Sequence, residues 1–276
     1  MSAGGSAAGH APGRRRARAF TLIEMALVLA ILGAIATAAL QPLGVQLEAR
    51  DRRATAATLE AAIEALYGHA IVHGRLPCPD APSDGDGRED RTADGRCARV
   101  AGLLPAADLG VRAFDAWGNR LRYRVTTRAA PAAAGASFTM ADDGYCHRSD
   151  GTLDLCERGD LTVLTRGDDP RTAVRESNAA FTLADAVPAV VISHGANGHG
   201  AWRPGGGMVA LPAGHLDEAA NAGAGSTYYA RNYAAARADC HDDGAGRPAP
   251  CGFDDLLRWI SPTILAARLV RGGRLP

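Results

Sequence analysis

The chain contains no lysine, so all thirty of its basic residues are arginine. Thirty acidic residues balance them, and the formal net charge at pH 7 is zero. No overall electrostatic field therefore draws the protein to nucleic acid, and we predict no nucleic-acid partner. Aromatic residues account for only 5% of the 276 residues, which favours a loop-rich domain with a modest core.

The sequence also lacks complete motifs for catalysis and for phosphate binding. Gly205–Gly207 is not followed by the Lys-Ser/Thr pair of a phosphate-binding loop. In VISHGANGHG, Val191 occupies the position of the first glycine of the G-x-S-x-G motif of hydrolases. Ser193 and His194 are adjacent, so on a strand they point to opposite faces and are not placed to act as nucleophile and base. His194 and His199 are candidate metal ligands, but we favour a strand that leads into a turn and predict neither an enzyme nor a cofactor.

Six cysteines, an even number, follow the N-terminal hydrophobic run. In an exported chain this distribution favours disulfides over zinc ligands. The alternative is a zinc site in which His147 and His241 act beside cysteines, but the sequence contains no CxxC pair. The spacing predicts three bridges that each close a short polar loop, namely Cys78–Cys97, Cys146–Cys156 and Cys240–Cys251.

The run Phe20–Leu40 is hydrophobic and follows four arginines, at positions 14, 15, 16 and 18. As a helix its 21 residues extend about 30 Å, enough to cross a bilayer. The positive-inside rule then places the N-terminal residues in the cytoplasm and the chain after Leu40 outside it. One carboxylate, Glu24, interrupts the run, and a carboxylate in hydrocarbon costs up to about 2.5–3.5 kcal/mol.

Three interpretations of this run compete. Ala36–Ala38 fits the A-x-A site of a cleaved signal peptide, and cleavage there would release a soluble periplasmic enzyme or binding protein. A plain membrane anchor would instead keep the helix and carry a periplasmic domain that never polymerises. Neither explains Glu24, because an acid in such a segment is normally retained for a partner.

The third interpretation rests on Arg18–Glu24, RAFTLIE, which resembles the processing site of type IV prepilins and of the pseudopilins of type II secretion. The resemblance implies that a membrane peptidase cuts between Ala19 and Phe20 and then N-methylates Phe20. Glu24 becomes the fifth mature residue, and its carboxylate pairs with the methylated amine of a neighbouring subunit during filament assembly. Ala19 departs from the family, which usually has glycine before the cut.

On this resemblance the protein is expected to be a structural subunit, a minor pilin or pseudopilin of a type IV pilus or type II secretion filament. The expected partners are prepilin peptidase, other pilin or pseudopilin subunits, the inner-membrane assembly platform and membrane lipid. The expected location is the inner membrane, with one span and a periplasmic C-terminal domain that enters a periplasmic or surface filament. The residues leave open whether the machine is a pilus, a secretion system or a DNA-uptake apparatus.

We expect three parts: a cytoplasmic leader peptide (residues 1–19), a transmembrane and assembly helix (20–47) and a periplasmic head (48–276). The expected fold is α+β, with a long N-terminal helix packed on an antiparallel β-sheet, disulfide-stapled loops in residues 74–252 and short helices in 253–276. The half-helix at residues 48–73 is amphipathic, because apolar side chains recur there at helical spacing. They are Leu59, Ala62, Ile63, Leu66, Ala70 and Ile71.

The clearest strand signal is Phe114–Thr127, FDAWGNRLRYRVTT. Leu121, Tyr123 and Val125 alternate with arginines, which predicts one buried face and one solvated arginine face. The pattern D-x-W-G-N-x-x-x-Y, which begins at Asp115, resembles the start of the sheet in pseudopilin heads. Further strands are expected at residues 137–141, 161–165 and 187–193, a connector at 129–136, a long loop at 203–226, and short helices at 254–260 and 262–270.

Acidic residues gather between the first two cysteines. Some pseudopilins bind calcium in their heads, and oxygen-rich loops suit that ion. The EF-hand register fails, because Arg88 and Glu89 stand where a ligand and the obligatory glycine belong. We therefore favour a solvated loop closed by a disulfide. The weak calcium candidates in this loop are Asp84, Asp86, Asp90 and Asp94.

Overall fold

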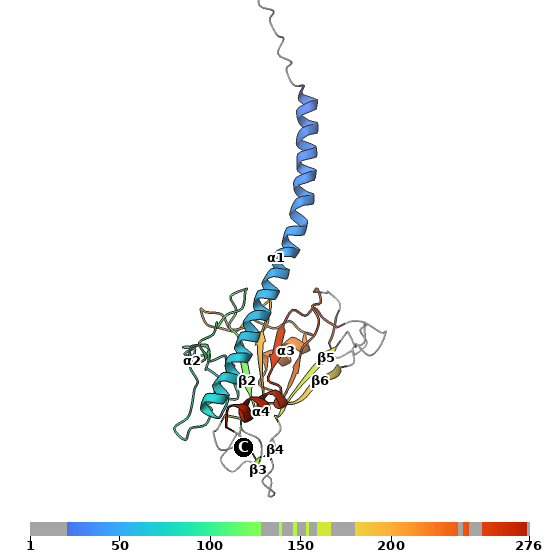
Figure 1. Ribbon diagram of the computed structural model, residues 1–276. Coiled ribbons are helices and arrows are strands. Elements are labelled where there is room, and N and C mark those ends of the chain that lie inside the picture. Colours follow the sequence, from blue (N-terminus) through green and yellow to red (C-terminus); the bar gives the residue numbers. More distant parts are fainter. Residues whose placement is uncertain are drawn as a thin grey trace, which may run out of the picture. The chain divides into compact units, whose positions relative to one another are not determined.

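A computed structural model of the chain describes eight stretches, which are residues 21–127, 138–139, 146–147, 153–154, 159–166, 180–236, 240–242 and 250–274 (Figure 1). Side chains are described for all of these except residues 36–43, 146–147 and 153–154. The chain divides into two compact units, Met1–Ala49 and Arg50–Pro276.

The first unit contains the start of helix α1 (Leu22–His73). Its described apolar side chains are exposed, with Leu22 at 92% and Ile23 at 79% of their accessible surface. No helix in the described part of the chain combines the length and the hydropathy of a membrane span. The expectation of a transmembrane helix at residues 20–47 therefore stays a prediction.

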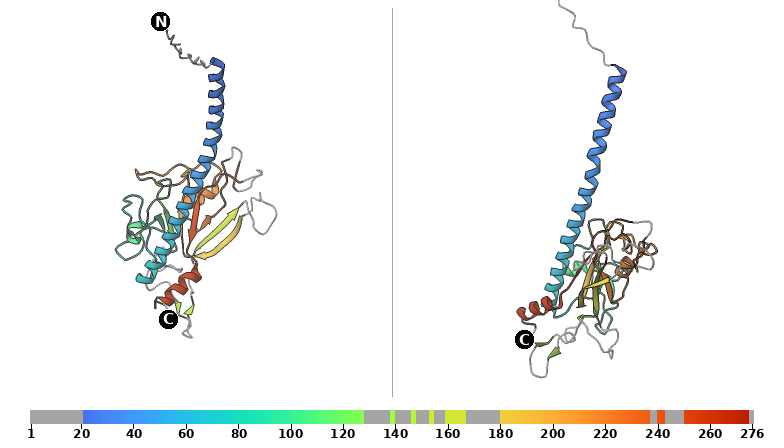
Figure 2. Two further views of the ribbon diagram at one scale, coloured as in Figure 1. Left: turned by 45° about the horizontal axis from the view of Figure 1, so that its top comes forward. Right: turned by 90° about the vertical axis from the view of Figure 1, so that its right-hand side faces the viewer.

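In the second unit, the remainder of α1 packs its apolar stripe against a four-stranded sheet. Leu59, Ala62, Leu66 and Ala70 are fully buried, as their helical spacing predicts. The sheet has the order β1-β2-β7-β9, and all of its pairs are antiparallel. Figures 1 and 2 show this part of α1 beside the sheet. The strands are β1 (Ala101–Leu103), β2 (Arg122–Val125), β7 (Ala189–Ser193) and β9 (Leu256–Trp259).

A second sheet of order β6-β5-β8 covers the other side of the first. β5 pairs antiparallel with β6 and parallel with β8. Val190 and Ile192 of β7 pack with residues of this sheet, while Val191 packs on the side of α1. The first sheet is therefore buried on both faces. The strands of the second sheet are β5 (Leu161–Arg166), β6 (Ala180–Val187) and β8 (Thr227–Tyr229).

This second layer makes the expectation of a solvated arginine face wrong. Arg122 and Arg124 are only 7% and 5% exposed. Arg122 donates to the carbonyl of Gly223 at 2.7 Å, and Arg124 pairs with Asp160 at 2.8 Å. The long side chains bury their stems between the layers while their guanidinium groups find acceptors at the periphery.

The smaller elements complete the second unit. They are α2 (Ala106–Leu109), β3 (Cys146–His147), β4 (Leu153–Asp154), α3 (Leu216–Ala222) and α4 (Pro262–Arg271). The strand expected at residues 161–165 is confirmed by β5, most of that at 187–193 by β7, and the helix at 262–270 by α4. Residues 138–139 form a bend rather than the expected strand, and the rest of 137–141 lies outside the described residues, as does 129–136.

Two local expectations are wrong. Residues 254–260 were expected to form a helix, but Leu256–Trp259 forms β9, because its backbone pairs with β7 and its side chains pack on both layers. Residues 203–226 were expected to form only a loop, but they contain α3. This short helix is held by three buried polar side chains, Asp217, Glu218 and Asn221, which a surface loop would not bury.

Candidate functional site

The N-terminal candidate site begins with a helix cap. Thr21 directly precedes α1, and its Oγ1 accepts a hydrogen bond from the backbone N–H of Glu24 at 3.3 Å. Thr21 and Glu24 have the S/T-x-x-E spacing of a capping box. The carboxylate of Glu24 lies in the first helical turn, where the positive end of the helix dipole stabilises it. Local helix chemistry is therefore a second explanation for this acid, beside filament assembly.

In the head, the D-x-W-G-N pattern forms a turn that ties two strands together. Asp115 Oδ1 accepts from the backbone N–H groups of Trp117 at 3.0 Å and Asn119 at 2.8 Å. Asp115 Oδ2 accepts from Ser193 Oγ of β7 at 2.7 Å, and the Asn119 side chain donates to the carbonyl of Gly195 at 2.8 Å. The pattern thus anchors the turn before β2 to the end of β7.

Ser193 and His194 are not a nucleophile and base pair. The Ser193 hydroxyl is bound to Asp115, whereas the His194 Nδ1 lies 3.5 Å from Asp255 Oδ1. Both residues are almost fully buried, Ser193 at 0% and His194 at 1% exposure. Their side chains therefore serve separate polar contacts, as the alternation of a strand predicts.

His199 takes part in a different cluster, which the sequence did not reveal. His199 Nδ1 lies 2.9 Å from Glu218 Oε2, and His215 Nδ1 lies 3.0 Å from the same oxygen. The two imidazole rings meet edge to face, with centroids 5.6 Å apart. Glu218 is fully buried, and its Oε1 accepts from the Asn197 side chain at 2.9 Å.

Asp254 and Asp255 are buried next to Glu218. One carboxylate oxygen of each of the three acids lies within 4.8 Å of the others. Burial, together with Asp255 and Glu218, raises the pKa of Asp254 to about 6, although Arg52 and the Asn197 N–H lower it. Burial also raises the pKa of Asp255, against a lowering by His194.

The turn between β7 and α3 brings these groups together. Gly195 has φ +61°, and a Cβ there would lie 2.5 Å from the Asp254 side chain and backbone oxygen. Only glycine fits this position, because both the backbone conformation and the space exclude a side chain. The close approach allows the Asn197 N–H to donate to Asp254 Oδ2 at 2.8 Å.

The acidic loop after Cys78 brings together two of its four calcium candidates. Asp84 and Asp90 each place an oxygen within 4.8 Å of Asp80, a buried residue that the sequence analysis did not select. Burial and the neighbouring acids raise the pKa of Asp80 to about 6. Asp86 instead accepts from the Arg88 N–H at 2.8 Å, and Asp94 pairs with Arg96, so neither joins the group. The disulfide that closes this loop is present, whereas the interpretation of the loop as solvated and without calcium stays a prediction.

Comparison with known families bears on the N-terminal site. Residues 14–40 match the family model of the prokaryotic N-terminal methylation motif. The chain carries the N-terminal motif of type IV pilins and pseudopilins. No curated protein and no solved structure matches the chain.

Of the three residues expected to take part in processing and assembly, the described part of the chain includes only Glu24. Ala19 and Phe20 lie outside the described residues. The matched motif spans both of them, and it covers the four arginines and the apolar run as well. The motif supports a pilin-type structural role, whereas the positions of cleavage and methylation stay predictions.

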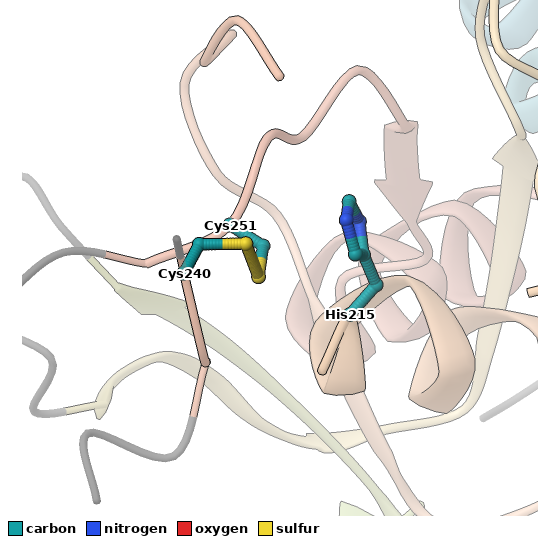
Figure 3. Close-up of side chains that lie close together, drawn as sticks. All are labelled: His215, Cys240 and Cys251. Atoms are coloured by element: carbon teal, nitrogen blue, oxygen red, sulfur yellow. A yellow bond between two sulfur atoms is a disulfide. The ribbon is translucent and has the colours of Figure 1, made fainter. Parts of the chain in front are cut away.

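The structure contains two of the three expected disulfides, Cys78–Cys97 and Cys240–Cys251. The third expected bridge, Cys146–Cys156, lies outside the residues whose side chains are described, and so does His147. Figure 3 shows that the Cys240–Cys251 bridge lies close to His215. Because the two sulfurs are bonded to each other, they are not available as thiolate ligands for zinc beside this histidine.

The residues missed in the head share one feature, which is wide separation along the chain. His199 was selected as a candidate metal ligand, but its partners were not: His215 occupies the N-cap position of α3, Glu218 lies within that helix, and Asp254 and Asp255 precede β9. The spacing of His215 and Glu218, three residues apart, was a usable signal, because it places both on one side of a helical turn. The remaining contacts depend on the fold.

Proposed function

We propose that this protein is a low-copy structural subunit, a minor pilin or pseudopilin, that is processed between Ala19 and Phe20 and assembled through its N-terminal helix. The observation that carries the proposal is the match of residues 14–40 to the N-terminal methylation motif. Its partners are then prepilin peptidase, the assembly platform and other pilin-type subunits. Before assembly, the run Phe20–Leu40 resides in the inner membrane with the head in the periplasm.

Charge balance supports this assignment. Cleavage after Ala19 removes all four arginines that precede the run and creates one cationic amine at Phe20. Glu24 is the only charged side chain in Phe20–Leu40, so the processed segment carries one positive and one negative charge. Pairing these charges between neighbouring subunits offsets the cost of placing each in an apolar helix bundle.

The exposed apolar side chains of the first unit agree with the same role. Leu22, Ile23, Leu29 and Ile35 are each more than half exposed within that unit. A contiguous apolar surface of this kind marks a membrane or protein contact, and the helices of neighbouring subunits would cover it in a filament. The polar residues of the head would then remain on the outside of the bundle.

The decisive experiment is N-terminal sequencing and mass measurement of the mature protein, from cells with and without prepilin peptidase. We expect N-methylated Phe20 in the presence of the peptidase and the uncleaved leader in its absence. A terminus near Ala39 that does not depend on the peptidase would instead identify a secreted soluble domain and refute the proposal.

The role of Glu24 is tested by two substitutions that separate its charge from its capping function. Glutamine also completes a capping box, so Glu24→Gln keeps the cap and removes the charge. We expect Glu24→Gln and Glu24→Ala both to be processed but absent from sheared filaments. Thr21→Ala, which removes the cap and keeps the charge, serves as the matched control and should still assemble. Assembly of Glu24→Gln at the normal level would show that capping alone explains the acid.

A further inference from the structure

Three side chains of the head meet at one oxygen atom. His199 comes from the turn after β7, His215 directly precedes α3, and Glu218 lies in the first turn of that helix. The Nδ1 atoms of the two histidines lie 2.9 and 3.0 Å from Glu218 Oε2, and a ligand atom of each residue is within 4.8 Å of the others. The two imidazoles are partly accessible, with 24% and 12% of their side-chain surface exposed, whereas Glu218 has none.

The carboxylate of Glu218 is held from behind. Asn197 donates to its Oε1 at 2.9 Å, which leaves Oε2 directed to the two histidines. Hydrogen bonds of this kind, from outside the ligand set, orient metal-binding side chains in proteins. The Asn197 side chain thus orients the one carboxylate that both histidines contact.

The surroundings hold more negative charge than hydrogen bonds satisfy. Asp254 and Asp255 approach Glu218, and both are at least nine-tenths buried. Within the described residues, the Oδ1 atoms of both acids and both ring nitrogens of His194 are buried without a hydrogen-bond partner. Buried polar atoms without partners are uncommon in folded proteins. Two of these four atoms, His194 Nδ1 and Asp255 Oδ1, lie 3.5 Å from each other, and the other two are His194 Nε2 and Asp254 Oδ1.

We propose that His199, His215 and Glu218 bind a divalent transition-metal ion of the zinc type. Two imidazole nitrogens and one carboxylate oxygen form a donor set that this ion prefers, with metal–ligand distances of about 2.0–2.2 Å. The ion would occupy the accessible side of the cluster, where the exposed edges of the two histidines leave a further position open to solvent. Asp254 and Asp255 would balance its charge without contacting it.

Other ions and ligands fit less well. Calcium prefers six to eight oxygen ligands, and this cluster places two nitrogens on the accessible side. Cys240 and Cys251 lie near His215, but they form a disulfide and cannot bind as thiolates. The remaining alternative is that both imidazoles donate hydrogen bonds to Glu218 Oε2 and no ion binds, which metal-binding measurements decide.

Such an ion would link segments that are distant in the sequence. The turn that contains His199 follows β7, α3 contains Glu218, and the acids behind it lead into β9. A bound cation stabilises the folded head by mass action and holds this surface in one conformation. The inference concerns the head alone and does not depend on processing or filament assembly.

The test uses the full-length protein in detergent, stripped with EDTA and dialysed against zinc, cobalt or calcium ions, with bound metal measured by mass spectrometry. We expect one zinc ion per chain and a visible absorption spectrum for bound cobalt that indicates nitrogen ligands. Loss of an outer hydrogen-bond partner alone lowers metal affinity about 10–100-fold, so His199→Ala and His215→Ala should each weaken zinc binding by more than about 100-fold. Asn197→Ala should fall within the 10–100-fold range.

A matched control addresses adventitious binding to surface histidines. His69 and His73 stack on α1 with ring centroids 4.2 Å apart, so they are a second described histidine pair to which zinc might attach. The double variant His69→Ala/His73→Ala should leave the tight site unchanged. Circular dichroism of the stripped variants verifies that each substitution leaves the head folded.

Three results would overturn the proposal. The first is the absence of stoichiometric zinc binding in the unaltered protein. The second is zinc binding that persists in His199→Ala and His215→Ala but disappears in the control variant. The third is calcium binding that is tighter than zinc binding and insensitive to His199→Ala, which would assign the acids to an oxygen-only site.

Discussion

Asp115 offers the sharpest test of how the head is held together. It is 8% exposed and accepts hydrogen bonds from Ser193 Oγ, the Asn119 N–H and the Trp117 N–H. Asp115→Ala leaves all three donors without their acceptor. The hydroxyl of Ser193 and the N–H of Asn119 are buried, and an unpaired buried donor costs about 1–3 kcal/mol. We therefore expect a loss of about 3–6 kcal/mol in the free energy of unfolding, counting a smaller share for the half-buried Trp117 N–H.

Such a loss is large against a typical total stability of about 5–15 kcal/mol, so the variant should unfold at a much lower denaturant concentration. The assay is urea unfolding followed by tryptophan fluorescence and circular dichroism. Asp84→Ala, at an exposed carboxylate, is the control and should change the free energy of unfolding by less than about 0.5 kcal/mol.

A double-mutant cycle with Ser193 separates the orphaned hydroxyl from the other effects. Ser193→Ala removes the donor whose pairing Asp115 provides. The double variant has no Ser193 hydroxyl that could be left unpaired. The losses in the free energy of unfolding of the two single variants should therefore sum to about 1–3 kcal/mol more than the loss in the double variant. Strict additivity would refute the reasoning, because it would mean that Ser193 and Asp115 do not interact. A loss below about 1 kcal/mol for Asp115→Ala would refute it as well.

Three further predictions concern other parts of the head. Replacing Cys78 and Cys97 by serine removes a disulfide between residues 19 positions apart, and should lower the free energy of unfolding, measured by chemical denaturation, by about 3 kcal/mol. Peptide mapping of the unaltered protein verifies the Cys78–Cys97 pairing. Burial alone would raise the pKa of Glu89, but its hydrogen bonds with Arg75 and with a backbone N–H lower this pKa to about 2. The ionised Glu89 therefore stabilises the folded protein above pH 4.5, and this stabilisation is lost as the pH falls towards 2. Glu89→Gln should therefore be less stable than the unaltered protein at pH 7 by about 3 kcal/mol and equally stable near pH 2, as measured by unfolding across that range. Leu265→Ala, at a fully buried position of α4, should lower the free energy of unfolding by about 2–5 kcal/mol, and a value below 1 kcal/mol would show that α4 does not pack as described.

Features that depend on neighbours in the sequence could be predicted. The stripe of α1 was visible because helical spacing places Leu59, Ala62, Leu66 and Ala70 on one side, and all four are fully buried. The two described disulfides close loops between successive cysteines, so proximity in the sequence was a sufficient guide. The methylation motif is likewise a contiguous segment.

Features that depend on the second sheet could not be predicted from the sequence. Arginines alternate with apolar residues around Tyr123. The same alternation is expected when the arginines face solvent and when they reach acceptors at the edge of a second sheet, so the pattern does not distinguish the two cases. Gly223 and Asp160, which bind Arg122 and Arg124, come from remote segments. β9 was missed for the same reason, because its pairing with β7 outweighs the local preference for a helix.

The candidate site in the head was only partly predictable. Val191–Gly200 was singled out for its serine and histidines, and His199 does belong to the cluster. Its partners were missed because each is an ordinary surface residue by local sequence, and only the left-handed turn at Gly195 brings Asp254 against this segment. A pair such as Ser193 and His194 is prominent in the sequence, yet the fold assigns its members to different partners.

The head buries two groups of carboxylates, and the contrast between them favours a cation at one. In the first group, Asp217 and Asp242 share Arg231, and Arg166 also pairs with Asp217, so each carboxylate has a guanidinium within 3.1 Å. In the second group, of Glu218, Asp254 and Asp255, no arginine forms an ion pair within the described part of the chain. Arg52 lowers the pKa of Asp254 only by its field. Histidines are the basic side chains that contact the second group, at Asp255 and at Glu218. A divalent ion bound by His199, His215 and Glu218 would supply this group with the fixed positive charge that Arg166 and Arg231 supply to the first.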